Sequence, residues 1–153
     1  VNRYQLFEND KITPKLYDHS GRYILMEHGC PAFSAEMSGD ELKHCLRSLF
    51  ELVAKLHKRG YVHGDVKPSN VLRLLDGSIR LIDFEFTDRS GRLVIGGTSG
   101  YKAYETLCDK VKLLNATQDM WSLGIIIAEW VCIIYNSPDS PAYSFQLRYM
   151  MQM

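Results

Sequence analysis

The sequence predicts an α+β fold, in which a small sheet precedes a largely helical region. Three observations in the 153-residue chain lead to this class. Two short β-forming runs stand near the N-terminus, a long amphipathic helix follows them, and a hairpin then precedes a helix that is apolar on every side. This order of elements fits the α+β class best.

The first two strands are expected at residues 15–18 and 23–27. Ser20 and Gly21 stand between them, and both residue types are common in tight turns. The two runs therefore predict a pair of short strands joined by a turn.

A long helix is predicted to begin after Ser38 and to end at Gly60. Ser38 and Glu41 have the spacing of a capping box, in which each side chain bonds the backbone of the other residue. Gly60 marks the end, because glycine commonly ends helices. Between these two residues, apolar residues recur at steps of three and four, which predicts one buried face: Leu42, Cys45, Leu46, Leu49, Phe50, Val53 and Leu56.

A hairpin is predicted from residues 71–74 and 79–82, which flank Asp76 and Gly77. Glycine adopts positive φ without steric cost, and aspartate tolerates it better than most residues, so the pair suits a tight turn.

The second half is expected to be mostly loop and helix. Residues 84–100 are loop-like, a helix is predicted near residues 104–114, and the apolar helix is predicted from about Asp119. Serine–proline pairs at 137–138 and 140–141 then interrupt the pattern.

The composition excludes some classes of partner. Lys plus Arg equals Asp plus Glu, 18 against 18, which gives no sign of a nucleic-acid or membrane-surface partner. The apolar run at residues 120–135 contains Glu129 and is too short to span a membrane. The four cysteines are widely spaced, which favours reduced thiols in a cytoplasmic or nuclear protein.

Four polar residues suggest phosphoryl transfer. Asp65, Lys67 and Asn70 occur within one six-residue turn, and Asp83 follows a strand. Mg²⁺ takes oxygen ligands, which Asn70 and Asp83 can supply. Asp65 can orient an attacking hydroxyl and accept its proton, and Lys67 can offset phosphoryl charge.

This run, V-H-G-D-V-K-P-S-N-V-L followed by I-D-F, resembles the H-R-D-x-K-x-x-N and D-F-G motifs of Ser/Thr protein kinases. The resemblance implies that Asp65 is the catalytic base and that Lys67 contacts phosphate. It implies that Asn70 and Asp83 are metal ligands and that Leu72 packs under the adenine of ATP.

Two further blocks carry the same resemblance. Residues 97–105 are similar to the G-T-x-x-Y-x-A-P-E end of a kinase activation segment. Residues 119–124 are similar to the D-x-W-S-x-G opening of the buried central helix of kinases.

Upstream, residues 23–29 resemble the hinge of a kinase. Met26 then corresponds to the gatekeeper, and the backbone of Glu27 and Gly29 is expected to face adenine.

The resemblance implies a partial kinase domain over residues 1–153. Residues 1–30 would form the end of the N-terminal lobe and the hinge, and residues 31–153 the C-terminal lobe through its central helix. The expected cofactors are ATP and Mg²⁺, and the expected partner is a protein substrate. The rest of the N-terminal lobe and the later helices are expected from the parent domain, so this chain alone is expected to be inactive.

Three residues depart from the family pattern. Gly64 replaces the arginine of H-R-D, which normally pairs with a phosphate on the activation segment, so control by that phosphate is not expected. Glu85 replaces the glycine of D-F-G and is expected to restrict the backbone there, since glycine alone is free at positive φ. Tyr104 replaces the proline of A-P-E.

Two other functions remain open. A non-catalytic pseudokinase is favoured by Glu85 and by the absence of a glycine-rich nucleotide loop. A small-molecule kinase of the aminoglycoside or choline type also carries H-G-D and I-D-F-E motifs, but the G-T-S-G-Y-K-A block argues for a protein substrate.

Overall fold

The computed structural model describes residues 2–34, 36–94, 96–108 and 113–135. It is an α+β fold, as the sequence predicts. In chain order the elements are α1 (Asn2–Glu8), β1 (Leu16–His19), β2 (Ile24–Met26), β3 (Gly29–Pro31), α2 (Gly39–Lys58), β4 (Tyr61–Val62), η1 (Pro68–Asn70), β5 (Val71–Leu74), β6 (Ile79–Leu81), β7 (Asp88–Arg89), η2 (Ser99–Tyr101), α3 (Tyr104–Cys108) and α4 (Ala116–Tyr135).

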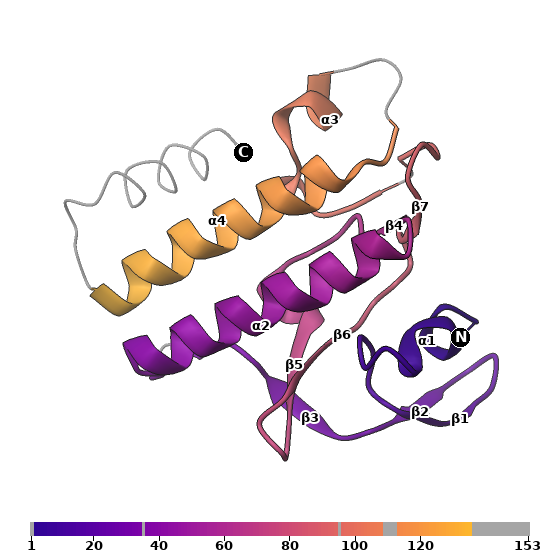
Figure 1. Ribbon diagram of the computed structural model, residues 1–153, viewed down its shortest axis with the longest axis horizontal. Helices are drawn as coiled ribbons and strands as arrows, with labels where there is room; N and C mark the ends of the chain where they lie inside the picture. The colour runs from indigo at the N-terminus through magenta and orange to yellow at the C-terminus, as the bar shows by residue number, and fades with distance from the viewer. Residues whose placement is uncertain (1, 35, 95, 109–112, 136–153) are drawn as a thin grey trace.

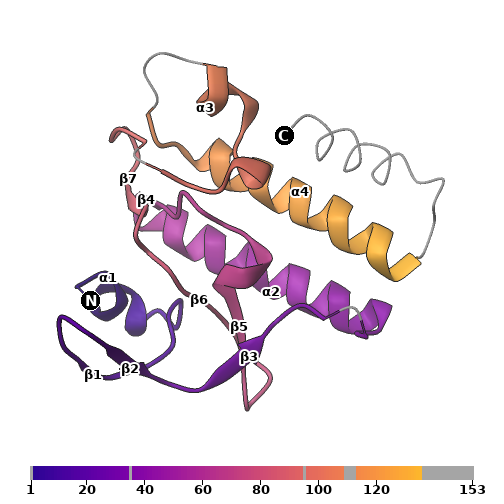
Figure 2. The same cartoon turned by 180° about the vertical axis from the view of Figure 1, so that it is seen from behind.

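The strands of the described residues form three small antiparallel sheets. β1 pairs with β2, β5 lies between β3 and β6, and β4 pairs with β7. Helix α2 lies between α4 and the β3-β5-β6 sheet, with α4 alongside it (Figures 1 and 2). The predicted hairpin is therefore confirmed, and its strands pack against the long helix.

Helix α2 forms the centre of the core, as its sequence pattern predicts. Ser38 caps it, and the reciprocal bonds with Glu41 are both present. The buried side chains of its apolar face are Leu42, Cys45, Leu49, Leu52, Val53 and Leu56. Burial of a leucine-sized side chain stabilises a fold by about 1.5–3 kcal/mol, so this face is a major source of stability.

Helix α1 was not predicted from the sequence. It has two turns, with no acidic residue in its first turn and no basic residue in its last turn to mark its ends. Tertiary contacts stabilise it: Phe7 is fully buried and lies edge-on to Tyr61, with ring centroids 5.1 Å apart. Helices this short depend on such packing, since nucleation is unfavourable.

Two helix boundaries differ from the prediction. The helix expected near 104–114 is α3, which ends at Cys108, and residues 109–112 lie outside the described part. Leu113 instead forms a β-bridge with Leu93, so the helical prediction there is wrong. Helix α4 begins before Asp119, because Asn115 Oδ1 accepts the Thr117 N–H (2.9 Å) as a helix cap does. The predicted break at 137–141 lies outside the described residues.

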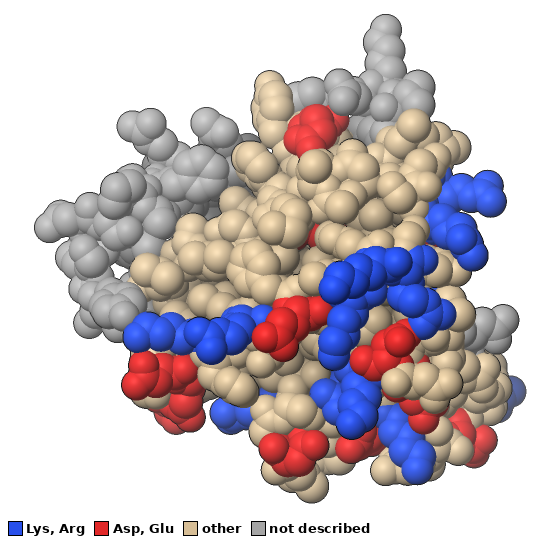
Figure 3. Space-filling view, in the orientation of Figure 1, with Lys and Arg blue, Asp and Glu red and all other residues tan. Residues whose placement is uncertain are grey.

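Helix α4 is apolar around most of its circumference. Its buried face includes Leu123 and Ile126, while Met120, Trp121, Val131 and Ile133 are exposed by 39–47%. Figure 3 shows a largely uncharged surface over α4, and basic and acidic side chains interspersed below it. Among the described residues, no helix has the length and hydropathy needed to cross a membrane.

Candidate active site

The structure brings Asp65, Lys67 and Asn70 together in the loop after β4. The Asp65 carboxylate is 3% exposed. Its Oδ1 accepts the backbone N–H of Thr98 (2.6 Å). Its Oδ2 accepts from Lys67 Nζ (2.7 Å) and from Asn70 Nδ2 (3.2 Å). Three donors from two segments therefore fix the orientation of this carboxylate.

These contacts keep Asp65 ionised. Burial alone would raise the pKa of the Asp65 carboxyl, but the hydrogen bonds from Lys67 and Thr98 outweigh burial and lower that pKa below its ordinary value. At neutral pH the group is a carboxylate, which can accept a further hydrogen bond or a proton because each oxygen carries two lone pairs.

Asn70 is oriented by the same network. Its Nδ2 donates to the Asp65 carbonyl (2.9 Å) as well as to the carboxylate, which leaves the side-chain oxygen available to a cation. The backbone carbonyl of Asn70 accepts the N–H of Ile82 (3.0 Å). This bond links the loop to the segment that carries Asp83.

Asp83 adopts a left-handed backbone conformation, with φ of 61°. Such a conformation costs a non-glycine residue about 1–2 kcal/mol, so the surroundings must hold it. The Tyr4 hydroxyl accepts the Asp83 N–H (2.9 Å). Arg3 Nη1 donates to the carbonyls of Phe84 and Glu85, at 2.6 Å each. Helix α1 therefore clamps the candidate metal-binding segment.

Glu85 does not create the strain that its position suggests. Among the described non-glycine residues, only Lys11 and Asp83 have positive φ. Glu85 therefore lies in a backbone region that any residue can adopt, and its side chain is exposed to solvent. The expectation that Glu85 restricts the backbone is wrong for this conformation.

His63 is buried behind the catalytic loop and holds it in place through its ring nitrogens. It is fully buried, its Nε2 lies 3.2 Å from the Ile82 carbonyl, and its Nδ1 accepts the Asp65 N–H (3.3 Å). Its ring lies 5.0 Å from that of Phe84. Burial lowers the pKa of the His63 imidazole. A neutral ring with both nitrogens engaged is structural.

Asp119 anchors the loop to α4, a role that sequence reasoning did not assign. It is 1% exposed. Its Oδ2 accepts the N–H of His63 (2.8 Å) and lies 2.8 Å from His57 Nε2, and its Oδ1 accepts the N–H of Gly64 (3.0 Å). The sequence did contain a signal, because Asp119 is a carboxylate at the start of a mostly apolar helix. A buried charge needs hydrogen-bond or ion-pair partners, which points to contacts with another segment.

The backbone conformation and the close packing at position 64 require glycine. It has φ of 80°, and a Cβ at this position would lie 2.9 Å from the Phe86 carbonyl oxygen. Any side chain here, including the arginine of the family motif, has to displace that backbone.

We expect Gly64→Ala to lower the free energy of unfolding by roughly 1–3 kcal/mol more than Gly77→Ala does. Both glycines have positive φ, 80° and 82°, so the conformational cost is matched. Only Gly64 adds a steric contact, since nothing lies within 4 Å of a Cβ at Gly77. Chemical denaturation of the two variants measures the difference, and equal losses would contradict the steric interpretation.

The predicted hinge residues lie at the end of β2, at the start of β3 and in the short segment between them. Met26 ends β2 and is half-buried, and Gly29 begins β3, opposite Leu74 of β5. A Cβ on Gly29 would lie 3.2 Å from the Cβ of Leu72, so these two candidate adenine contacts are neighbours. The Glu27 N–H donates to the Lys15 carbonyl (2.8 Å), so this backbone donor is already engaged.

Thr98 contacts two of the candidate catalytic residues. Besides the bond from its N–H to Asp65, its hydroxyl accepts from Lys67 Nζ (2.8 Å). It joins the activation segment to the catalytic loop, although sequence reasoning did not place it among the candidate site residues.

Comparison with known proteins identifies the family. A model of the protein kinase domain matches residues 16–151. The chain belongs to the protein kinase family. Its catalytic-loop motif, activation segment and central helix all lie within the matched region of this kinase.

Several curated kinases are similar in sequence. Serine/threonine-protein kinase Kist of Mus musculus is 36% identical over 100 residues, covering 58% of this chain and 24% of that protein. Dual specificity protein kinase Ttk of Danio rerio is 31% identical over 159 residues, covering 89% of this chain and 16% of that protein. The chain spans about a quarter or less of the length of these two relatives.

Proposed function

We propose that this kinase domain transfers the γ-phosphoryl group of ATP to serine or threonine hydroxyls of proteins. The observation that carries the proposal is the buried Asp65 carboxylate, ionised and fixed by Thr98, Lys67 and Asn70. Activity belongs to a protein that carries this chain with the rest of its domain. Residues 1–30 would supply the end of the N-terminal lobe and the hinge, and residues 31–153 most of the C-terminal lobe.

The residues present fit Mg²⁺ and ATP, which protein kinases generally use. The side-chain oxygen of Asn70 is left available by the bonds of its nitrogen, and Asp83 is a carboxylate, so both are hard oxygen donors. Bound Mg²⁺ would neutralise charge on the phosphates. Met26, Glu27, Gly29 and Leu72 would hold the adenine.

Each catalytic-loop residue then has a defined role. Asp65 accepts a hydrogen bond from the substrate hydroxyl, orients it and takes its proton as the hydroxyl attacks. Lys67, held between Asp65 and Thr98, supplies positive charge beside the transferred phosphoryl. The charges of Asp65 and Lys67 compensate each other before substrate binds, which lowers the cost of burying them.

The serine/threonine specificity is supported by Lys67 of the catalytic motif and by relatives such as Kist. The experiment is phosphorylation of a general protein substrate with labelled ATP, followed by phosphoamino-acid analysis. We expect phosphoserine and phosphothreonine. Phosphotyrosine in comparable amount would instead favour the dual specificity that the name of Ttk states for that protein.

One observation favours a second candidate, a pseudokinase that binds partners without transfer. Glu85 adds a carboxylate two positions after Asp83, and extra negative charge changes metal affinity. Nucleotide binding without any phosphoryl transfer would support the pseudokinase.

The matches to protein kinases argue against a small-molecule kinase. We also propose a cytoplasmic or nuclear location, supported by the free thiols of Cys30 and Cys45.

The phosphate on the activation segment is not expected to control this kinase. Gly64 offers no guanidinium to bind it, and the Thr98 hydroxyl already bonds Lys67. We expect phosphatase treatment of the purified protein to leave its activity little changed. A strong loss of activity after phosphatase treatment would contradict this expectation.

Two Thr98 variants test the role of its hydroxyl. Thr98→Ala removes the bond to Lys67 and should lower turnover by roughly tenfold or more, as for loss of a hydrogen bond to a charged group. Thr98→Ser retains the hydroxyl and serves as the control.

A further inference from the structure

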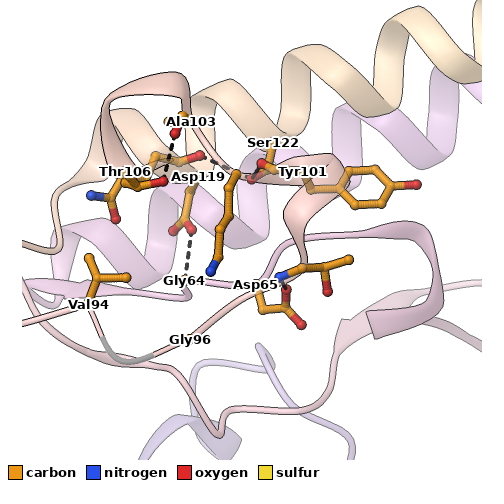
Figure 4. Close-up of a pocket in the computed structure, with 12 residues that line it drawn as sticks. Gly64, Asp65, Val94, Gly96, Tyr101, Ala103, Thr106, Asp119 and Ser122 are labelled. Carbon is orange, nitrogen blue, oxygen red and sulfur yellow. Dashed lines mark hydrogen bonds between the residues drawn. The ribbon is translucent and has the colours of Figure 1, made fainter. Parts of the chain in front are cut away.

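A pocket lies beside Asp65, between the catalytic loop, the activation segment and the start of α4 (Figure 4). Gly64 and Asp65 form one wall, and Asp119 and Ser122 of α4 form another. Lys102 also lines this pocket. An acceptor hydroxyl bound at Asp65 would therefore place the adjoining residues of its chain near this pocket, since consecutive Cα atoms are only about 3.8 Å apart.

Lys102 lies close to the catalytic carboxylate. A Cβ built on Gly97 would lie 3.1 Å from Lys102 Cε, 2.7 Å from the Gly64 carbonyl oxygen and 3.8 Å from Asp65 Oδ1. The Lys102 side chain, the Gly64 carbonyl and the Asp65 carboxylate therefore all lie within 4 Å of this one position beside Gly97. Lys102 is half-buried. Its backbone N–H donates to the Ser99 carbonyl (3.4 Å), but among the described residues its side-chain ammonium has no hydrogen bond or ion pair.

The acids in the pocket are already satisfied by other groups. Both oxygens of Asp65 are bonded by Thr98, Lys67 and Asn70, and Lys67 compensates its charge. Both oxygens of Asp119 accept backbone N–H groups, and Oδ2 also contacts His57. Neither carboxylate lies within ion-pair distance of Lys102.

The neutral polar side chains of the pocket are also engaged. Ser122 Oγ donates to the Tyr101 carbonyl (2.7 Å), Thr106 Oγ1 to the Ala103 carbonyl (2.6 Å), and Gln118 Nε2 to the Leu113 carbonyl (2.9 Å). Of the described lining residues, Lys102 therefore has the donor group best able to bind an incoming acidic side chain.

We propose that Lys102 is a specificity-determining residue that selects a substrate with a Glu or Asp directly beside the acceptor serine or threonine. This inference rests on the proposed kinase function. An acidic side chain pairs with the half-buried ammonium, whereas a basic side chain is repelled by it. Charge complementarity of this kind gives selectivity more than affinity.

The test is a binding measurement that does not depend on catalysis. Fluorescent peptides carry alanine in place of the acceptor and Glu, Gln or Lys directly before or after it. Their affinity for the protein, used with any sequence that flanks residues 1–153 in its gene, is measured by anisotropy at constant ionic strength. We expect the better Glu peptide to bind about five- to tenfold more tightly than its Lys counterpart, as for a partly screened charge pair.

Variants at Lys102 test whether this residue causes the preference for the Glu peptide. We expect Lys102→Met to abolish it, Lys102→Glu to reverse it, and Lys102→Arg to retain it. Lys55→Met is the matched control, since Lys55 is exposed on α2 and does not line the pocket. Circular dichroism checks that each variant is folded.

Each outcome decides the question. Equal affinities for the Glu and Lys peptides, or a preference that survives in Lys102→Glu, would overturn the proposal. Displacement of the Glu peptide by inorganic phosphate, but not by chloride at equal ionic strength, would show a phosphate site and also overturn it.

Serine-containing versions of the same peptides separate this inference from the proposed function. Binding preference without phosphoryl transfer would leave the selectivity intact and reject the kinase activity. Phosphoryl transfer with no charge preference would support the kinase activity and reject the selectivity of Lys102.

Discussion

Asp83→Asn is expected to abolish Mg-ATP turnover. The substitution keeps the shape of the side chain but removes the negative charge that binds Mg²⁺. It should not disturb the fold, because asparagine tolerates the left-handed φ of 61° and the backbone N–H still donates to Tyr4. Loss of activity would therefore report loss of the metal ligand. The measurement is the rate of phosphoryl transfer across a titration of Mg²⁺.

The control for Asp83 is Asp76→Asn, which removes an exposed turn carboxylate from the hairpin. Its activity should match wild type. Wild-type turnover in Asp83→Asn would show that Asp83 does not hold the metal.

The second large effect is expected from Asp65→Asn. The amide keeps one oxygen for the Thr98 N–H but loses the ion pair with Lys67, and it cannot accept a proton from the hydroxyl. We expect turnover to fall by roughly 10²-fold or more, as for loss of a general base. Nucleotide affinity should be retained, because Asp65 is assigned to the acceptor hydroxyl and not to ATP.

The pH dependence gives a separate check on Asp65. Its pKa is held below the ordinary value by Lys67 and Thr98, so the carboxylate stays ionised as the pH falls from neutral. We expect no inflection from this group in wild-type turnover between about pH 5 and 8. An inflection in that range that disappears in Asp65→Asn would mean that its pKa is raised.

Local sequence predicted most of the candidate site. Asp65, Lys67 and Asn70 lie within one turn, so their proximity follows from chain connectivity and a short 3₁₀ helix at Pro68–Asn70. The long helix α2 and the β5-β6 hairpin were also predictable, because periodicity, caps and turn residues are local signals.

Contacts between distant segments were not predictable. Arg3 reaches carbonyls that are 81 and 82 positions away in the sequence, and Asp119 binds backbone groups 55 and 56 positions away. Tertiary pairing also overrode the helical pattern at Leu113, which pairs with Leu93 instead. No local pattern encodes such partners.

Glu85 shows a different limit of sequence reasoning. A motif identifies the position where a family carries glycine, but not which residue of the turn takes the positive φ in this chain. Here that residue is Asp83, held by Tyr4, so the backbone conformation at Glu85 does not require glycine.

The most direct test of the proposed kinase activity is phosphoryl transfer by wild type and Asp65→Asn, measured side by side. Both proteins carry any sequence that flanks this chain in its gene and receive saturating Mg-ATP and the same protein substrate. Nucleotide affinity is measured in the same samples. We predict Mg²⁺-dependent transfer in wild type and a loss of about 10²-fold in Asp65→Asn at unchanged nucleotide affinity. Equal rates in the two proteins, or nucleotide binding without transfer in wild type, would contradict the assignment of this site.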